Sequence, residues 1–310
     1  MNSRRTSISF LVTVILYFAC AVGIEVMWMV IPNFSLNLLW NNFIVELAIL
    51  LPGMIFALFS GENLPRFLGF HRIKVTTLLL IIPFTMLSTP LLTLLNVITQ
   101  FWVRNAAASA MQNYGIAQMP FWQVWLSIGL FAPFCEEVVC RGLFYRGYEK
   151  SWGAFRAMFL SALLFALIHM NLNQAVYAFA MGIMSILLVE ATGSLWSSVF
   201  YHALINSSQT AMMYVALKLN PAVYSDAEQM IRESNYLLHA TVGYLIAAAV
   251  TLPLAVGLLI VMSGNQGRKG ALSALLRDRK VKYKKDNPAV IILILAVILC
   301  TAFIIWSVTG

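Results

Sequence analysis

Long apolar stretches separated by short polar turns dominate this chain of 310 residues and restrict it to a small class of folds. Hydrophobic residues make up 61% of the sequence and charged residues only 10%, against about a quarter in a soluble domain. Because a bilayer crossing needs about 20 apolar residues, little chain remains for a soluble catalytic or nucleic-acid-binding domain. We predict an all-α, polytopic transmembrane helical bundle, with spans over residues 7–31, 42–59, 75–99, 121–145, 154–169, 173–190, 195–217, 237–262 and 289–308.

Lysine and arginine residues gather in alternate connections between these spans. With the amino terminus inside, 17 of the 20 basic residues fall in inner connections: Arg4, Arg5, Arg66, Arg72, Lys74, Arg141, Arg146, Lys150, Arg156, Arg268, Lys269, Arg277, Arg279, Lys280, Lys282, Lys284 and Lys285. The other three are Arg104, Lys218 and Arg232. Basic residues favour the cytosolic side of a membrane, so this split predicts a cytoplasmic amino terminus.

The spans divide into three groups along the chain. Residues 1–120 form the N-terminal helices, residues 121–217 form core helices that carry the polar motifs below, and residues 218–310 form the C-terminal helices. The last group contains a basic cytoplasmic loop over residues 264–287. We interpret this loop as an anchor for the topology, with contact to lipid headgroups or to a partner as the alternative.

Ionisable side chains are rare at membrane depth in this sequence, and they cluster between residues 134 and 206. Such a side chain costs at least about 2.5 kcal/mol on insertion scales, so it faces the protein interior and marks a candidate functional site. Three short motifs contain these side chains: Glu136-Glu137 followed by Arg141, Phe165 followed by His169, and His202 followed by Asn206.

Helix geometry predicts that the three motifs lie at a similar depth. Glu136 and His169 are placed symmetrically about the turn at residues 152–153, so an antiparallel hairpin brings them to one height. At a rise of about 1.5 Å per residue, that height is about 20 Å above the inner boundary. His202 and Asn206 follow the turn before the seventh span, and their expected height is roughly 14 to 20 Å above the same boundary.

Spacing within each motif indicates a chemistry. Glu137 and Arg141 are four residues apart on one helix side, which predicts a buried ion pair. Glu136 points about 100° away from them and stays free for a cavity. His202 and Asn206 project together as two hydrogen-bond donors, which suits a developing oxyanion. A carboxylate and an imidazole opposite paired donors are typical of a hydrolytic site that activates water.

Each motif taken alone also has a structural interpretation. A membrane-embedded His or Asn can join two helices by a hydrogen bond, and a Glu-Glu pair can contain one ion-pair partner and one bystander. The joint pattern at matched depth favours function. Of the other glutamates near spans, we read Glu190 as an interfacial residue that ends its helix, and Glu25 and Glu46 as structural.

With these residues in place, the sequence resembles the CPBP intramembrane proteases, or Abi family. This group of CAAX proteases and bacteriocin self-immunity and processing proteins includes the Ras-converting type of prenyl-protein endopeptidase. The three motifs fill every position of the family pattern, in order and on separate helices. The resemblance covers residues 121–210 directly, and the flanking helices match only as generic spans.

The resemblance implies a bundle of about eight helices with an intramembrane cavity open toward the cytosol and the membrane. It implies that Glu136 and His169 activate the attacking water and that His202 and Asn206 form the oxyanion hole. The supporting residues would be Glu137, Arg141 and Phe165. The ninth span is then an addition to the usual core.

The resemblance also implies a function and a cellular location. We expect an intramembrane endopeptidase of a bacterial cell membrane that acts on membrane-associated, lipidated or peptide substrates, with no nucleic-acid partner; substrate and oligomeric state stay open. A non-catalytic immunity or scaffold protein of the same fold is the alternative, and it predicts that Glu136→Gln keeps its function. A proton-coupled transporter is disfavoured because no repeated half is found in the sequence.

Metal dependence is a separate question. Glu136, His169 and His202 could bind zinc as two histidines and a carboxylate. The sequence has no H-E-x-x-H helix, and Asn206 is a better donor than ligand. Its four cysteines lie in apolar segments without a C-x-x-C pair. We therefore expect metal-free hydrolysis without a cofactor, with zinc as the alternative.

Overall fold

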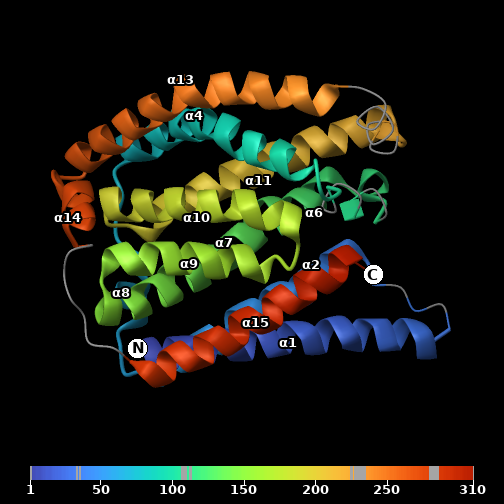
Figure 1. The fold of residues 1–310 in the computed structure, drawn as a ribbon, viewed down its shortest axis with the longest axis horizontal. Helices are drawn as coiled ribbons and strands as arrows, with labels where there is room; N and C mark the ends of the chain where they lie inside the picture. The colour runs from blue at the N-terminus through green and yellow to red at the C-terminus, as the bar shows by residue number, and fades with distance from the viewer. Residues whose placement is uncertain are drawn as a thin grey trace.

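Helices occupy all nine predicted positions in the computed structural model, which describes residues 2–32, 34, 36–105, 110–111, 114–223, 226, 235–278 and 286–309. The long elements are α1 (Ser3–Val30), α2 (Leu38–Leu58), α4 (Val75–Thr99), a continuous helix over Phe121–Trp152, α9 (Ala154–Ile168), α10 (Leu172–Thr192), α11 (Leu195–Leu219), α13 (Tyr236–Asn265) and α15 (Asn287–Thr309). Shorter elements are α3 (Leu64–Leu68), η1 (Ile116–Gln118) and α14 (Ala271–Asp278). The predicted all-α bundle is confirmed (Figure 1).

Seven of the described helices are long and apolar enough to cross a membrane. The two predicted spans outside this set are α9 and α11. With 15 residues, α9 covers roughly 22 Å at about 1.5 Å per residue, less than the hydrocarbon thickness. Helix α11 has 25 residues but carries many serines together with His202 and Asn206. Helix α9 and the N-terminal half of α11 are packed inside the bundle, where protein neighbours replace lipid.

The helices run alongside one another with alternating direction (Figure 1). Helix α13 packs along α4, α9 packs along α10, and α1 packs against both α2 and α15. The 121–152 helix, α9, α10 and α11 contact one another. They form the centre of the bundle and carry all three polar motifs.

Helix α15, the ninth span, attaches through one narrow stripe. Its buried side chains are Ala289, Leu293, Ala296, Cys300 and Ile304, whose spacing of three and four residues keeps them on one face. This face meets α1 and α9, while Ile294, Ile298 and other large apolar side chains of α15 are exposed. The helix therefore lies at the edge of the bundle.

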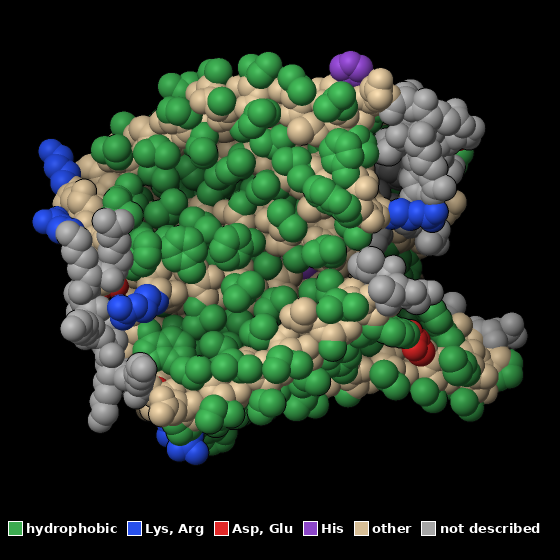
Figure 2. Space-filling view, viewed as in Figure 1, with side chains coloured by type: hydrophobic (Ala, Val, Ile, Leu, Met, Phe, Trp, Pro, Cys, Tyr) green, Lys and Arg blue, Asp and Glu red, His purple; other side chains and the backbone are tan. Residues whose placement is uncertain are grey.

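The outer surface is apolar along the helices and charged mainly at one end. Figure 2 shows hydrophobic side chains over most of the visible face, with several of the Lys and Arg side chains at the end where α8 and α14 lie. We call this the basic end; its described residues are Arg4, Arg5, Arg66, Arg72, Lys74, Arg146, Lys150, Arg156, Arg268, Lys269 and Arg277. Arg232, Arg279, Lys280, Lys282, Lys284 and Lys285 lie outside the described residues.

The fourth span differs from its prediction in length and in winding. It comprises α6 (Phe121–Val124), the π-helical η2 (Trp125–Phe131), α7 (Ala132–Glu137), the π-helical η3 (Val138–Tyr145) and α8 (Arg146–Trp152). The predicted end at Tyr145 is wrong. Arg146 and Glu149 form an ion pair at 2.8 Å and support a further helical stretch, so the chain turns only at Gly153, where φ is 82°.

Candidate active site

The motif residues come from three neighbouring helical segments of the bundle centre. Helix α7 carries Glu136 and Glu137, and the adjoining η3 carries Arg141. Rare π-helical turns, which occur frequently at functional sites, flank α7 on both sides. Helix α9 carries Phe165 with His169 as its C-cap, and α11 carries the histidine and asparagine of the third motif.

Glu137 is the centre of a fully buried polar cluster. Its Oε1 atom lies 3.0 Å from a guanidinium nitrogen of Arg141, so the predicted ion pair is confirmed. The same oxygen lies 2.9 Å from Nδ1 of His202. All three side chains are at most 2% exposed. Since an unpaired buried charge costs several kcal/mol, each member of this cluster requires the others.

Phe165 links the three motifs through its ring. The Cζ atom of Arg141 lies 4.1 Å from the ring centroid, a cation–π contact. The rings of His169 and His202 lie edge-on to it, with centroid distances of 4.8 Å and 5.7 Å. The aromatic residue of the second motif therefore provides the surface on which a buried cation and two imidazoles are arranged.

Glu136 occupies a different environment from its neighbour. Its side chain is 12% exposed, and its Oε2 atom lies 3.6 Å from Nε2 of His202, beyond hydrogen-bond distance. This oxygen has no hydrogen-bond partner. As predicted from the turn of the helix, Glu136 is separated from the Glu137–Arg141 pair and keeps an oxygen free to accept a proton.

His169 is held by its own helix. Its Nδ1 atom lies 2.8 Å from the carbonyl oxygen of Phe165. Because a carbonyl only accepts, Nδ1 must carry a proton, and Nε2 is left with a lone pair when the ring is neutral. Met170 follows at a φ of 49°, so the chain leaves α9 directly after the imidazole. Within the described residues, His169 and Glu136 share no direct hydrogen bond.

Asn206 and His202 have separate anchors. The Asn206 Nδ2 group donates to the carbonyl oxygen of Ile128, at 3.2 Å, in the π-helical η2. One N–H of the amide is used in this way, and the second is left to donate elsewhere. His202 is anchored through Nδ1 by Glu137, so Nε2 is the ring nitrogen that faces the half-buried Glu136.

One glutamate that the sequence predicted to be structural lies beside the site. Glu46 of α2 is 3% exposed, and its Oε2 atom has no hydrogen-bond partner. Helix α2 packs against α7, and the Glu46 carboxylate interacts electrostatically with that of Glu136. The position of Glu46 in the middle of an apolar span is the sequence signal that could have assigned it to the site. Glu25 of α1, by contrast, is exposed.

Close backbone packing fixes the helices that carry these groups. The Ser161 hydroxyl of α9 donates to the carbonyl oxygen of Cys140 in η3, at 2.6 Å. On the other side of α9, a Cβ added at Gly182 of α10 would lie 2.9 Å from the Cα of Ala162. These two contacts hold α9 tightly between its neighbours, and with it the positions of Phe165 and His169.

Glu136, His169 and His202, the alternative zinc ligands predicted from the sequence, are not grouped as a metal site in this structure. Among the described residues, no three His, Cys, Asp or Glu side chains converge on a common point as a metal requires. Nδ1 of His202 faces Glu137 and Nδ1 of His169 faces a backbone carbonyl, so each ring has only Nε2 left for a ligand. We derive no catalytic step through a metal.

Comparison with known proteins finds a family match over the segment that carries the three motifs. Residues 118–208 match the family described as "Type II CAAX prenyl endopeptidase Rce1-like". This segment contains all three motifs, so the resemblance predicted from them is confirmed. Together with the apolar helices, it shows an integral multi-pass membrane protein with an Rce1-like segment at its centre.

A bacterial protein is also similar over a shorter segment. UPF0177 protein YbdI from Lactococcus lactis subsp. lactis (strain IL1403) is 34% identical over 70 residues. These residues are 23% of this chain and 37% of that protein, so the similarity extends over well under two thirds of the relative's length. The comparison with solved structures finds no match.

Proposed function

We propose that this protein is an intramembrane endopeptidase that hydrolyses peptide bonds of membrane-associated or lipidated substrates. The observation that supports it most strongly is the convergence of three separated motifs on one contact set. Glu137 contacts both Arg141 and His202, and Phe165 contacts the two histidines. A purely structural use of these groups would not require the free oxygen of Glu136 beside His202.

Glu136 acts as the general base in this proposal, with His169 as the second group on the water. Glu136 takes a proton from a water molecule, and the water oxygen attacks the carbonyl carbon of the substrate. His169 orients the water through Nε2, the nitrogen left with a lone pair by the bond to Phe165. When the C–N bond breaks, the proton passes from Glu136 to the leaving amine.

His202 and Asn206 stabilise the negative charge that develops on the carbonyl oxygen. Nε2 of His202 donates when the ring carries both protons, while Nδ1 donates to the carboxylate of Glu137. Asn206 donates through the N–H that Ile128 does not use. Two such donors, placed before reaction, are the usual device for an oxyanion. Glu137, Arg141 and Phe165 position these groups and do not touch the substrate.

The basic end faces the cytosol in this proposal, because positively charged residues favour that side of a bacterial membrane. The amino terminus then lies inside the cell. The described family is named for CAAX prenyl endopeptidases, so peptides with an attached lipid are the first substrate class to test. The reaction needs neither a cofactor nor a nucleic-acid partner.

The decisive experiment compares peptide termini in cells. Cells with the wild-type chain, with Glu136→Gln or with Glu25→Gln are matched for expression, and new termini in membrane and secreted fractions are identified by mass spectrometry. Glu25 is the control because it is an exposed glutamate on the outer helix α1. We expect specific termini to vanish only with Glu136→Gln, and the lost cleavage sites then name the substrates.

The opposite result has an equally clear meaning. If Glu136→Gln leaves all termini unchanged while a phenotype of the wild-type chain persists, the protein is not a protease. A non-catalytic immunity or scaffold role for the same fold is then the better account.

A further inference from the structure

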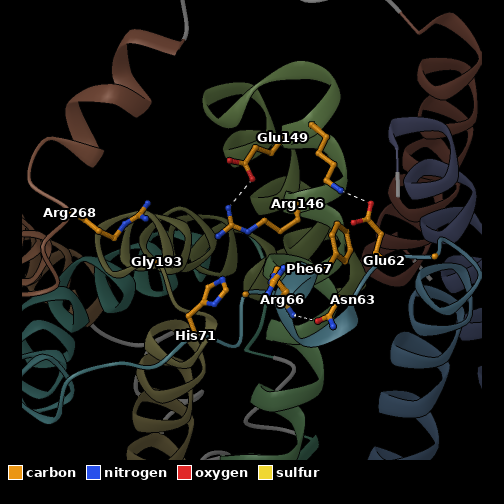
Figure 3. A pocket seen from close by; sticks show the side chains of 12 residues that line it. Glu62, Asn63, Arg66, Phe67, His71, Arg146, Glu149, Gly193 and Arg268 are labelled. Atoms are coloured by element: carbon orange, nitrogen blue, oxygen red, sulfur yellow. Dashed lines mark hydrogen bonds and ion pairs between the residues drawn. The ribbon is translucent and has the colours of Figure 1, made fainter.

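A polar cavity lies at the basic end, separate from the candidate active site. Its volume is about 520 Å³. Its walls come from the 61–71 segment that contains α3, from α8, from Gly193 between α10 and α11, and from Arg268 between α13 and α14. In Figure 3 the side chains of Arg66, His71, Arg146 and Arg268 approach this cavity from different elements.

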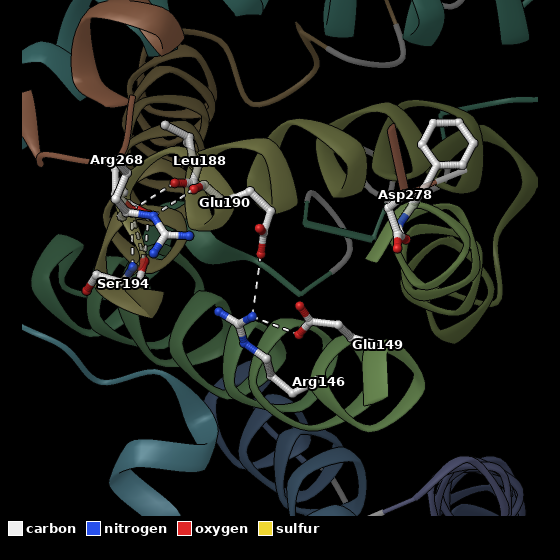
Figure 4. Close-up of polar contacts among 10 residues, drawn as sticks. Arg146, Glu149, Leu188, Glu190, Ser194, Arg268 and Asp278 are labelled. Carbon is white, nitrogen blue, oxygen red and sulfur yellow. Dashed lines mark hydrogen bonds and ion pairs between the residues drawn. The ribbon is translucent and has the colours of Figure 1, made fainter. Parts of the chain in front are cut away.

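Part of the charge around the cavity is already neutralised. Arg146 lies 2.8 Å from Glu149 and 3.4 Å from Glu190 (Figure 4). Glu190 therefore forms an ion pair near the end of α10. It is 9% exposed, so it is more buried than the interfacial position predicted from the sequence. On the opposite wall, Lys150 pairs with Glu62 at 2.6 Å. These pairs tie α8 to its neighbours and keep the shape of the cavity.

Two arginines of the lining, Arg66 and Arg268, form no ion pair with a carboxylate among the described residues. The guanidinium of Arg66 forms no ion pair among the described residues, and its side chain is exposed on α3. Arg268 donates through Nε to the backbone oxygen of Glu190 at 3.1 Å, which holds the guanidinium at the cavity wall. The lining carries four cationic side chains. Two of them, Arg146 and Lys150, are ion-paired with glutamates, so Arg66 and Arg268 are the two that can take an anion.

The cavity lies at the depth of lipid headgroups. It is formed where the spans α4, α10, α11 and α13 begin or end. The short helix α14 follows Arg268 directly, with Leu275 buried and Leu276 exposed. Short helices with apolar and basic residues at the ends of spans are typical of the membrane interface. A negatively charged group available at this level is the phosphate of a phospholipid.

We propose that this cavity binds the phosphate group of an anionic phospholipid between Arg66 and Arg268. A guanidinium presents two parallel N–H donors that match phosphate oxygens. His71, which is exposed on the same wall, donates a further hydrogen bond. Arg146 stays with its carboxylates and contributes positive potential.

The bound lipid also reinforces the start of α11. The carbonyl oxygen of Gly69 accepts from the amide of Leu195 at 2.8 Å, and that of His71 accepts from the Ser194 hydroxyl at 2.6 Å. Ser194 is the N-cap of α11, the helix that carries His202. Fixing the 66–71 segment against a lipid therefore holds this helix at its base.

The test uses purified full-length protein in neutral detergent. Thermal unfolding is followed while phosphatidylglycerol is added, and diacylglycerol with the same acyl chains serves as the probe that lacks phosphate. We expect a saturable rise in Tm with phosphatidylglycerol only. The double substitution Arg66→Gln/Arg268→Gln should weaken the apparent affinity about tenfold or more, since two charge-assisted contacts are lost.

A charge-matched variant controls for general attraction between a basic protein and an anionic lipid. Arg72→Gln/Arg277→Gln removes two exposed arginines, one directly after the 61–71 segment and one in α14, that lie outside the cavity lining. It should change the affinity less than about twofold. If the double cavity variant does not fold, Arg66→Gln alone gives the test, because its side chain is exposed on α3.

Three results would overturn the proposal. Equal losses in the cavity and control variants would show diffuse surface attraction. Absence of a saturable effect would show that no lipid site exists. Stabilisation by inorganic phosphate that equals and blocks the effect of phosphatidylglycerol would assign the cavity to free phosphate. Repeating the titration with Glu136→Gln separates this result from the outcome for catalysis.

Discussion

Helices at the centre of this bundle and helices at its edge differ in how much of their surface other helices cover and in the side chains they carry. In the most apolar 18-residue stretch of each helix, 50% of the residues are buried inside the protein for the 121–152 span and 61% for α10, against 22% for α13 and 28% for α15. The central helices carry charged and hydroxyl side chains, while α15 has no charged residue. High hydropathy therefore marks contact with lipid, and lower hydropathy marks the helices that build the site.

The physical reason is that lipid surrounds the edge helices, whereas the protein interior surrounds the central ones. Apolar side chains gain little by leaving lipid for a protein interior, so the edge helices need only a narrow stripe of close contacts. Charges at the centre must be paired within the protein, because no water is available to solvate them. The interior should accordingly be far more sensitive to substitution than the edge.

Removal of the buried cation should have the largest effect. Arg141→Met leaves Glu137 buried without its ion-pair partner, which should cost about 3–5 kcal/mol of unfolding free energy. The measurement is equilibrium unfolding in mixed detergent micelles. Adding Glu137→Gln to Arg141→Met should recover a large part of the loss, whereas a loss below about 1 kcal/mol for Arg141→Met would show that the cluster is solvated.

The next largest effect is expected when an apolar side chain is truncated at the centre and not at the edge of the bundle. Leu164→Ala in α9 removes a fully buried side chain and should cost about 2–5 kcal/mol, because it leaves a cavity. The matched change Ile298→Ala lies on the lipid-facing side of α15, where the side chain is 56% exposed. It should cost less than about 0.5 kcal/mol. Similar losses for both variants would contradict the division into centre and edge.

Added volume at glycine positions tests the backbone contact between α9 and α10. Gly182→Ala places a methyl group 2.9 Å from the Cα of Ala162, and the resulting shift should cost about 1–3 kcal/mol. Gly257→Ala in α13 meets no atom within 4 Å and should be stabilising by about 0.5–1 kcal/mol, since alanine favours the helix. Melting temperatures of the two variants should move in opposite directions.

The smallest effect is expected at the exposed ion pair of the basic end. The hydrogen bond from Lys150 lowers the pKa of Glu62 below its usual value of 4.5. Because the folded-state pKa is lowered, the pair contributes stability above pH 4.5, and the contribution is lost as pH falls through the lowered value. For a partly exposed pair the contribution is under about 1 kcal/mol.

The difference in Tm between wild type and Glu62→Gln should therefore shrink when pH falls from about 7 to about 3. High salt at neutral pH should also reduce it, because salt screens exposed charges. A difference that is constant over this pH range would show that Glu62 is unpaired in solution.

The three motifs were recognisable in the sequence because ionisable residues stand out in apolar helices. The positions of the nine helices and the ion pair of Glu137 with Arg141 followed from the same contrast and from helical spacing. The role of Phe165 as the surface under Arg141 did not, because a cation–π contact between α9 and η3 leaves no trace in the spacing of either helix. The same holds for the approach of Glu46 to the site.

The sequence by itself determined the class of molecule, the order of its helices and the identity of the polar residues at membrane depth, since each depends on composition and on contacts within one helix. Only the tertiary structure decided which nitrogen of His202 meets Glu137, that Asn206 is anchored on Ile128, and that Arg66 and Arg268 line one cavity. These features depend on distances between helices far apart in the chain, and interhelical packing sets those distances.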